Sequence, residues 1–255
     1  MASPDIVSRE LEYHEAIYSG FAQQHFAKPA VRAFRRHLAR RILEVTQATR
    51  SSRVLSLGCG IGDTELLLAP HVGDLAGADL SPAAIRQARA DAARAGLANV
   101  EFLAGDFGSL DFPPRSFDIV IAVFLLHHLP DQALHQLVHR IPGLLKPGGV
   151  FYSLDPSHYR LSGAIGRVVA PNLMKKYQSP GERELVPGFT AELFRQAGLD
   201  ATVRMYDFLS TPCAGLFPSA ARLYRLTRFA DEFLVRLPLL QRIGSNFEII
   251  AQASR

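Results

Sequence analysis

The stretch Leu57-Gly58-Cys59-Gly60-Ile61-Gly62 joins a short apolar run, 54–57, to a segment with helical spacing, 63–69. Glycines at alternate positions let the backbone turn sharply and approach a ligand with no side chain in the way. The N–H groups at the start of the following helix favour a bound carboxylate or phosphate. The stretch therefore predicts a ligand-binding turn between a buried strand and a helix.

Further apolar runs follow this turn and alternate with helical segments. Predicted strands cover 75–79, 100–104, 117–123, 150–154, 201–208 and 246–253, with predicted helices over 82–95, 131–145 and 190–197 and a turn at 146–149. Strands that alternate with helices at this spacing predict a parallel sheet with right-handed crossovers. We therefore expect an α/β fold, Rossmann-like, with a seven-stranded, mostly parallel sheet and helices on both faces.

Composition limits the class of protein. The chain has 255 residues, 48% of them hydrophobic, and a net charge of +4. The two cysteines, Cys59 and Cys213, have no pairing pattern, which indicates a reducing compartment and no zinc cluster. The N-terminus has no signal-peptide pattern. The longest apolar run, 119–126, is far shorter than the ~20 residues that cross a bilayer, so we expect a cytoplasmic protein without a transmembrane segment.

Arginines recur at helical spacing near the N-terminus. They are Arg32, Arg35, Arg36, Arg40 and Arg41. The pattern predicts a solvated helix face, and an anionic substrate or a membrane surface are the alternatives, so peripheral membrane contact stays open.

Two carboxylates follow the next two predicted strands. Asp79 ends the strand 75–79, and an acidic group there can accept hydrogen bonds from both hydroxyls of a ribose. Asp106 follows the strand 100–104 and can accept from an adenine amine, while Leu80 and Phe107 offer apolar surfaces to the ring. Taken singly, each carboxylate could also be a turn residue or a helix cap. Asp63, directly after Gly62, lies close to where a pyrophosphate would bind, which disfavours NAD.

The run 54–154 resembles the core of class I S-adenosylmethionine-dependent methyltransferases. Its segments FDIVIAV (117–123), FLLHHLPD (124–131) and LKPGG (145–149) are similar to the small-molecule branch that includes ubiquinone and menaquinone C-methyltransferases. The resemblance implies S-adenosylmethionine as methyl donor and S-adenosylhomocysteine as product. By it, Gly58 and Gly60 face the donor's methionine part, Asp79 holds the ribose, Asp106 and Phe107 hold the adenine, and Phe124 lies near the reacting centre.

One position departs from the family pattern. The family has an acidic residue two positions before the first glycine, where it orients the donor's amino group, and this chain has Ser56. Asp63, a backbone carbonyl or water could take over that contact.

The resemblance also divides the chain, which we expect to form a single domain. We expect an N-terminal helical cap at 1–47, with Pro29 between two helices, and a donor-binding core at 48–155. The acceptor-side half is expected at 156–255, with a possible helix in 156–188 and a helical insertion at 209–245 before the last strand. A long insertion of this kind suits the capping of a site.

Several side chains are candidates for a general base or for contacts to the acceptor. His127 and His128 follow the strand 117–123, and one of the pair is expected to pack inward. Asp155, His158 and Tyr159 follow the next strand. Tyr13, His14, Tyr18 and His25 lie on the predicted cap, where packing or the surface is an equal alternative.

The acceptor is expected to be a small, apolar molecule methylated on O, N or C. Leu223, Leu226, Phe229, Phe233 and Leu237 recur at helical spacing. This stripe could line an acceptor pocket or form a dimer contact, but packing on neighbouring helices is the favoured interpretation.

Three other functions were weighed. A nucleic-acid methyltransferase needs a Pro-Pro or Pro-Cys pair after the fourth strand, but Pro113-Pro114 and Pro212-Cys213 lie elsewhere, and no basic stripe is interleaved with aromatics. A metal-dependent catechol-type enzyme needs carboxylates there, so no metal is expected. A non-catalytic S-adenosylmethionine-binding protein is supported by Ser56 alone.

Overall fold

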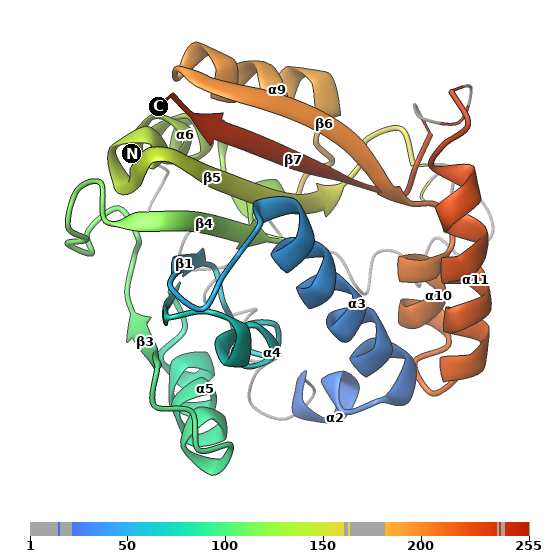
Figure 1. The fold of residues 1–255 in the computed structure, drawn as a ribbon. Coiled ribbons are helices and arrows are strands. Elements are labelled where there is room, and N and C mark those ends of the chain that lie inside the picture. The colour runs from blue at the N-terminus through green and yellow to red at the C-terminus, as the bar shows by residue number, and fades with distance from the viewer. Residues whose placement is uncertain are drawn as a thin grey trace.

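A computed structural model describes residues 15, 22–160, 163, 182–238, 240 and 243–254, and within them the strands form one seven-stranded sheet in the order β3-β2-β1-β4-β5-β7-β6 (Figure 1). The strands are β1 (Arg53–Leu57), β2 (Asp74–Asp79), β3 (Val100–Ala104), β4 (Phe117–Val123), β5 (Leu145–Pro156), β6 (Leu199–Asp207) and β7 (Asn246–Ala253). Strands β1 to β5 pair in parallel, and β7 runs antiparallel to both β5 and β6. The predicted fold class is confirmed.

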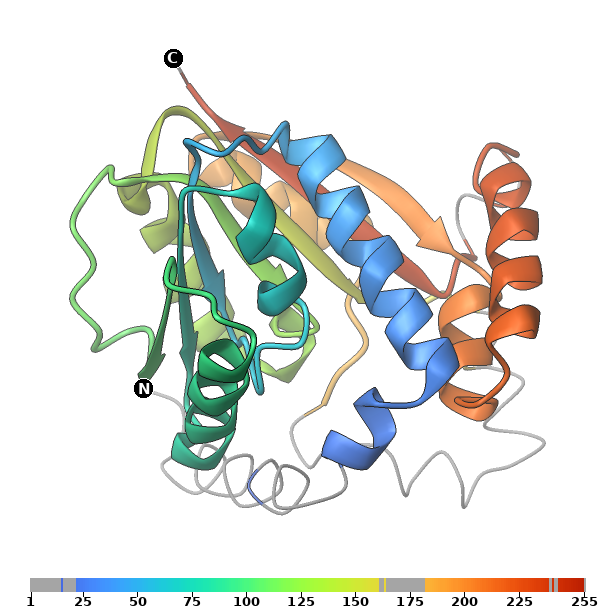
Figure 2. The same ribbon diagram turned by 60° about the horizontal axis from the view of Figure 1, so that its bottom comes forward.

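Helices cover both faces of this sheet. The described helices are α2 (Ala22–Phe26), α3 (Pro29–Thr46), α4 (Glu65–Leu68), α5 (Pro82–Arg94), α6 (Asp131–Leu144), α9 (Pro187–Gln196), α10 (Ser210–Leu216) and α11 (Ala221–Leu234), with short 3-10 turns at Ala69–His71 and Leu126–His128. Helices α3, α4 and α5 lie on one face, and α6 and α9 lie on the other (Figures 1 and 2). Helices α10 and α11 pack beside α3.

The alternation of side chains along β4 explains why both faces are covered. Ile119 and Ile121 belong to the apolar cluster that contains Phe34, Leu38 and Ile42 of α3. Val120 and Ala122, between and after them, belong to the cluster under α6 and α9. Because successive side chains of a strand point to opposite faces, the apolar run that follows Asp118 in β4 must be buried on both sides.

Local sequence explains where these helices begin. Pro29 and Pro82 occupy the first helical positions of α3 and α5, where the N–H group that proline lacks would have no partner inside the helix. Ser81 caps α5, and its hydroxyl accepts from the N–H of Ala84 at 3.1 Å.

Two element boundaries differ from the prediction. The turn expected at 146–149 falls inside β5, which begins at Leu145, because a register shift against β4 between Phe117 and Ile119 absorbs it. The helix expected at 63–69 is reduced to α4 and a 3-10 turn. Gly62, with φ +75°, continues the loop, and the α-helix starts only at Glu65.

The helical insertion at 209–245 contains α10 and α11, and α11 ends at Leu234, before Pro238. In the part of the chain that the structure describes, no helix is both long enough and apolar enough to cross a membrane. Tyr13, His14 and Tyr18, and most of the possible helix in 156–188, lie outside the described residues. The division into 1–47, 48–155 and 156–255 stays a prediction.

Candidate functional site

The glycine-rich turn lies where the strand order of the sheet reverses. It follows β1, and β1 pairs with β2 on one side and β4 on the other. A crevice outside the carboxyl ends of such strands is where open α/β sheets bind ligands. Gly58, Gly60 and Gly62 have φ values of +67°, +53° and +75°, which glycine adopts without strain. The predicted sharp turn is therefore formed, with backbone angles that favour glycine at these three positions.

The turn is fastened to the end of β2. The N–H groups of Gly58 and Cys59 donate to the carbonyl of Ala78 at 2.8 and 3.1 Å. The N–H of Gly60 donates to Oδ2 of Asp79 at 2.8 Å, and Oδ1 of Asp79 accepts from Ser81 N–H at 2.9 Å. A carboxylate offers about four acceptor positions, so Asp79 can hold the turn and still accept from a diol.

The residues predicted to hold the adenine lie beside Asp79. The N–H of Gly105 donates to the carbonyl of Asp79 at 2.9 Å, which joins the ends of β2 and β3. Asp106 is exposed, and its Oδ1 accepts from the N–H of Gly108 at 2.9 Å, so here it is also a turn residue. Phe107 is half-buried, and Leu80 is 38% exposed. Phe107 and Leu80 thus each leave part of their apolar surface exposed near the ends of β2 and β3.

Glu65 is a buried acid that the sequence analysis did not single out. The hydroxyl of Ser56 donates to its Oε1 at 2.6 Å. Its other oxygen, Oε2, is buried without a hydrogen-bond partner among the described residues. Burial raises the pKa of Glu65 to about 7, although the bond from Ser56 opposes the change. The sequence did contain a signal for this role. Ser56 stands where the family has an acid, and Glu65, nine positions later, is close enough across the turn to bond with it.

Helix α3 closes the crevice next to β4. Phe124 follows β4 with φ +54°, and its ring lies 6.1 Å from that of Phe34. The guanidinium of Arg35 lies 5.9 Å from the Phe124 ring, pairs with Asp63 at 2.6 Å and donates to Thr64 at 3.2 Å. The predicted solvated face holds for Arg32, Arg36 and Arg40, which are exposed, but is wrong for Arg35, which points inward, where carboxylate and rings replace water.

Arg41 also departs from that predicted face. It forms a two-pronged ion pair with Glu248 of β7, whose side chain is 1% exposed. The hydroxyl of Tyr152 donates to the same carboxylate at 3.3 Å. The pair fastens α3 to the sheet.

A histidine and a carboxylate pair at the ends of β4 and β5. Nδ1 of His127 lies 2.9 Å from Oδ1 of Asp155, which also accepts from the His127 N–H at 3.2 Å. Both side chains are buried, and burial raises the pKa of Asp155 to about 7. His128 is half-buried, with its ring 4.0 Å from that of His127. His127 is therefore the inward member of the pair.

The other candidate side chains lie in different surroundings. His158 is 3.6 Å from Glu184, Tyr159 is 51% exposed, and the His25 ring packs on Phe26. Cys59 is buried, which raises the pKa of its thiol and disfavours the thiolate. Among the described residues, no three histidine, cysteine or acidic side chains gather as metal ligands would.

A family model described as a methyltransferase domain matches residues 54–149, the segment that carries the turn, Asp79 and Phe124. Residues 54–149 therefore resemble the domain of class I S-adenosylmethionine-dependent methyltransferases.

Known methyltransferases resemble this chain to different extents. It is 32% identical to the uncharacterized methyltransferase YcgJ of Bacillus subtilis over 46% of this chain and 45% of YcgJ. The YcgJ crystal structure superposes with a TM-score of 0.59 at 20% identity, covering 86% of this chain and 99% of YcgJ. The match to YcgJ by sequence thus spans under half of that relative.

A longer match is found with the demethylmenaquinone methyltransferase of Listeria monocytogenes. Identity is 27% over 75% of this chain and 88% of the relative. A phosphoethanolamine N-methyltransferase 2 of Haemonchus contortus, solved with S-adenosyl-L-methionine, superposes with a TM-score of 0.61 at 20% identity, covering 86% of this chain and 53% of that one.

The residues present fit the methyl donor. A carboxylate with an unpaired oxygen, Glu65, suits an ammonium group, and Asp79 suits a ribose diol. A Cβ on Gly58 would lie 2.8 Å from Cδ1 of Leu125, so the packing of Leu125 requires glycine at this position of the turn. Gly58 follows β1, Asp79 ends β2, and Glu65 starts α4 after the glycine turn.

Proposed function

We propose that this chain transfers the methyl group of S-adenosylmethionine to a small, apolar acceptor, on O, N or C, by in-line displacement. The observation that carries the proposal is the glycine turn hydrogen-bonded to Asp79 at the point where the strand order reverses. The donor supplies an electrophilic methyl group, whose bond to sulfur breaks as the bond to the acceptor forms. The electron pair stays on sulfur, and S-adenosylhomocysteine leaves.

Each part of the donor would meet a group that matches it. The glycine turn at Gly58 and Gly60 would face the methionine part, and Asp79 would accept from the ribose hydroxyls. Asp106, Phe107 and Leu80 would hold the adenine, and Phe124 would lie beside the reacting centre. We add Glu65, whose buried Oε2 would accept from the amino group that Ser56 cannot bind as an ion pair.

The protein's own contribution is mainly to position the reactants. Holding acceptor and donor in line can contribute up to roughly 7–11 kcal/mol of the barrier. The rings of Phe34 and Phe124, packed 6.1 Å apart between α3 and β4, would exclude water from one side of the crevice. Arg35, paired with Asp63, would hold this wall against the glycine turn.

His127 is the general base that the geometry favours, for acceptors that carry a proton. In the tautomer whose Nδ1–H donates to Asp155, Nε2 carries the lone pair that can take up a proton. Asp155 would be a positioning residue that fixes the ring and stabilises the imidazolium as it forms. The proton would move from the acceptor to Nε2.

The names of the relatives support a small-molecule acceptor. One relative is described as a demethylmenaquinone methyltransferase, and a neighbour in structure is described as a phosphoethanolamine N-methyltransferase. Both names describe small acceptors, one apolar and one polar. The apolar rings near the crevice make the apolar class our choice for this chain.

Calorimetric titration with S-adenosylmethionine and S-adenosylhomocysteine tests the donor site. We expect micromolar binding that Asp79→Ala abolishes and that Asp74→Ala, at the exposed far end of β2, leaves unchanged. Mass spectrometry of acceptor mixtures then tests catalysis. Donor binding without any methylated product would support the non-catalytic alternative, and no donor binding would overturn the proposal.

A further inference from the structure

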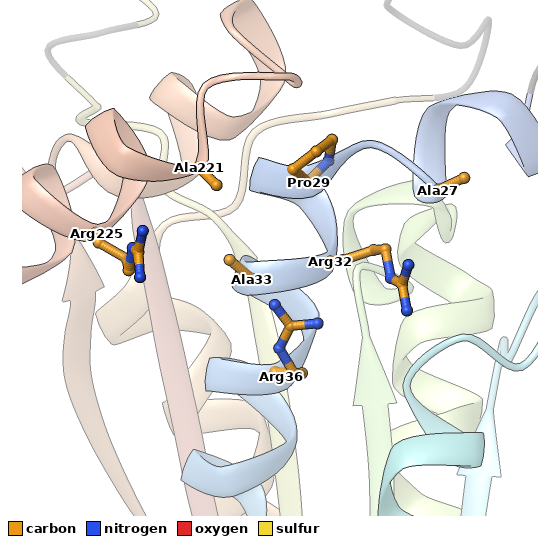
Figure 3. Close-up of a pocket in the computed structure, with 7 residues that line it drawn as sticks. All are labelled: Ala27, Pro29, Arg32, Ala33, Arg36, Ala221 and Arg225. Carbon is orange, nitrogen blue, oxygen red and sulfur yellow. The ribbon is translucent and has the colours of Figure 1, made fainter.

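A hollow of about 390 Å³ lies beside the start of α3 and of α11. It is lined by Ala27, Pro29, Arg32, Ala33, Arg36, Ala221 and Arg225, and we call it the arginine pocket (Figure 3). Arg32 and Arg36 come from successive turns of α3, and Arg225 faces them from the first turns of α11. Three guanidinium groups therefore surround a space whose other walls are methyl and methylene groups.

Among the described residues, no carboxylate neutralises these positive charges. None of the three arginines forms an ion pair with a carboxylate that the structure describes. Of the acids on the neighbouring helices, Glu44 pairs with Arg41, and Asp231 is buried and accepts from backbone N–H groups at the start of α10. Glu232 is exposed. The pocket therefore presents an uncompensated charge to any anion that reaches it.

His37 reports the same electrostatic field from inside α3. Its pKa is lowered to about 4, first by burial and then by the charges of Arg228, Arg40 and Arg41. Arg40 and Arg228 thus add to the positive potential around His37, whereas the charge of Arg41 is offset by Glu248.

Helix α11 exposes large apolar side chains next to the pocket. Leu223, Leu226, Phe229 and Phe233, here named the α11 stripe, are 39%, 65%, 59% and 56% exposed. This corrects the expectation that these residues pack in the core, because α11 buries Tyr224 and Asp231 instead. Leu237 is 49% exposed, and Leu216 and Phe217 at the end of α10 are 62% and 55% exposed. These apolar groups continue the stripe across both helices of the insertion.

We propose that the α11 stripe and the arginine pocket form a docking surface for a bilayer that contains anionic phospholipid. Exposed Arg222, Arg225 and Arg236 flank the stripe, as basic residues do on helices that lie in the membrane interface. A headgroup phosphate would occupy the arginine pocket, which is roomy enough for it. Leu226, Phe229 and Phe233 would enter the boundary between headgroups and acyl chains.

Charge argues against the other occupant of such a surface, a second copy of the chain. A two-fold contact through the same patch would place the arginines of both copies near each other. Their repulsion would have no carboxylate to offset it on α11 except Glu232 and the buried Asp231. A bilayer with phosphate headgroups supplies both the negative charge and the apolar layer.

Vesicle flotation of the full chain tests this surface. We expect binding to vesicles of equal parts phosphatidylcholine and phosphatidylglycerol, weaker binding to phosphatidylcholine alone, and loss of binding in high salt. Arg36→Ala/Arg225→Ala should weaken binding by about 30-fold, roughly fivefold for each arginine. Leu226→Ser/Phe229→Ser should weaken binding to both kinds of vesicle.

Matched controls use exposed residues elsewhere. Arg86→Ala/Arg204→Ala, on α5 and β6, and Phe189→Ser, on α9, should bind vesicles as the wild type does. All variants should bind S-adenosylhomocysteine equally, which separates failed folding from failed docking. Equal binding to both kinds of vesicle by the wild type and the arginine variant would overturn the proposal. So would binding of inorganic phosphate in the pocket without vesicle binding, or apolar-dependent dimers in light scattering.

Discussion

The hydroxyl of Ser56 on β1 lies 2.6 Å from Oε1 of Glu65 on α4. The strand therefore carries the small polar residue and the helix carries the acid, the reverse of what the family resemblance predicts for the strand position. Because the two side chains touch, the negative charge remains next to the place where the family holds it. The buried Oε2 of Glu65 has no hydrogen-bond partner among the described residues, and a donor's amino group would supply one.

The first prediction concerns donor affinity. Glu65→Gln keeps the shape of the side chain but removes the charge that would pair with the donor's amino group. We expect S-adenosylhomocysteine to bind about 10- to 100-fold more weakly, because hydrogen bonds to charged groups contribute ~1.5–3 kcal/mol. Binding of 5′-methylthioadenosine, which lacks the amino acid part, should not change. Calorimetry measures both.

Two further variants control this result. Ser56→Asp/Glu65→Ala returns the acid to the strand and should restore much of the affinity. Glu44→Gln, at an exposed acid of α3, should have no effect. Equal weakening of both ligands by Glu65→Gln would mean that Glu65 only supports the turn.

The second prediction concerns pH. The pKa of Glu65 is about 7 in the free protein, and a bound ammonium group would lower it. Donor binding should then release a proton, and affinity should rise as pH increases through 7 and level off above it. Titrations in buffers of different ionisation enthalpy detect the proton, and Glu65→Gln should abolish its release. A proton taken up instead would contradict this role.

The third prediction concerns stability without donor. The folded-state pKa of Glu65, about 7, lies above the ordinary value of 4.5, so the folded chain holds this proton more tightly than the unfolded chain. The wild type should lose stability as pH rises from about 4.5 to 7. Glu65→Gln lacks this loss and should be more stable than the wild type at pH 8, by up to about 3 kcal/mol. Denaturant unfolding at two pH values measures the difference, and a less stable variant at pH 8 would contradict the burial argument.

The fourth prediction concerns the base. Once an acceptor is known, His127→Asn should lower kcat by ~10²–10⁴-fold while leaving S-adenosylhomocysteine binding intact. Asp155→Asn should also lower kcat and alter its pH profile, because Asp155 fixes the His127 ring at 2.9 Å. His128→Asn is the control with a smaller effect. An unchanged pH profile in both His127→Asn and Asp155→Asn would remove the pair from the chemistry.

The fifth prediction concerns the join between α3 and the sheet. Arg41→Met leaves the buried carboxylate of Glu248 with the Tyr152 hydroxyl as its described partner, and should cost about 3–5 kcal/mol of unfolding free energy. Arg40→Met, one position earlier, should cost much less, since Arg40 is exposed. Adding Glu248→Gln to Arg41→Met should restore part of the stability. An Arg41→Met variant as stable as the wild type would show that water satisfies Glu248.

Much of the fold was predictable from the sequence because the buried strands are short runs rich in apolar residues. The run 117–123 is apolar at every position except Asp118, as expected of a strand covered on both faces, and β4 has these bounds. Glycines and prolines marked the ends of neighbouring helices, as Pro82 does for α5. The extent of β5 was missed, because its pairing across 146–149 depends on β4 rather than on local sequence.

The site was predictable where one segment carries it, and not where distant segments meet. The turn and Asp79 follow from neighbouring residues. Glu65 was missed because its meaning depends on Ser56 across the turn. The inward Arg35 and Arg41 and the exposed α11 stripe look alike in sequence, since helical spacing gives the period of a face but not the partner that the face meets.

The position of β7 has a consequence for how the chain is assembled. β7 follows β6 in chain order, yet it lies between β5 and β6, and it pairs with β5 from Val150 to Pro156 and with β6 from Leu199 to Asp207. During synthesis β6 therefore has no neighbour to join until β7 has left the ribosome, and α9, which packs on β6, waits with it. The parallel strands β1 to β5, which hold the glycine turn, can pair first. β7 then inserts between β5 and β6 and joins β6 to the sheet.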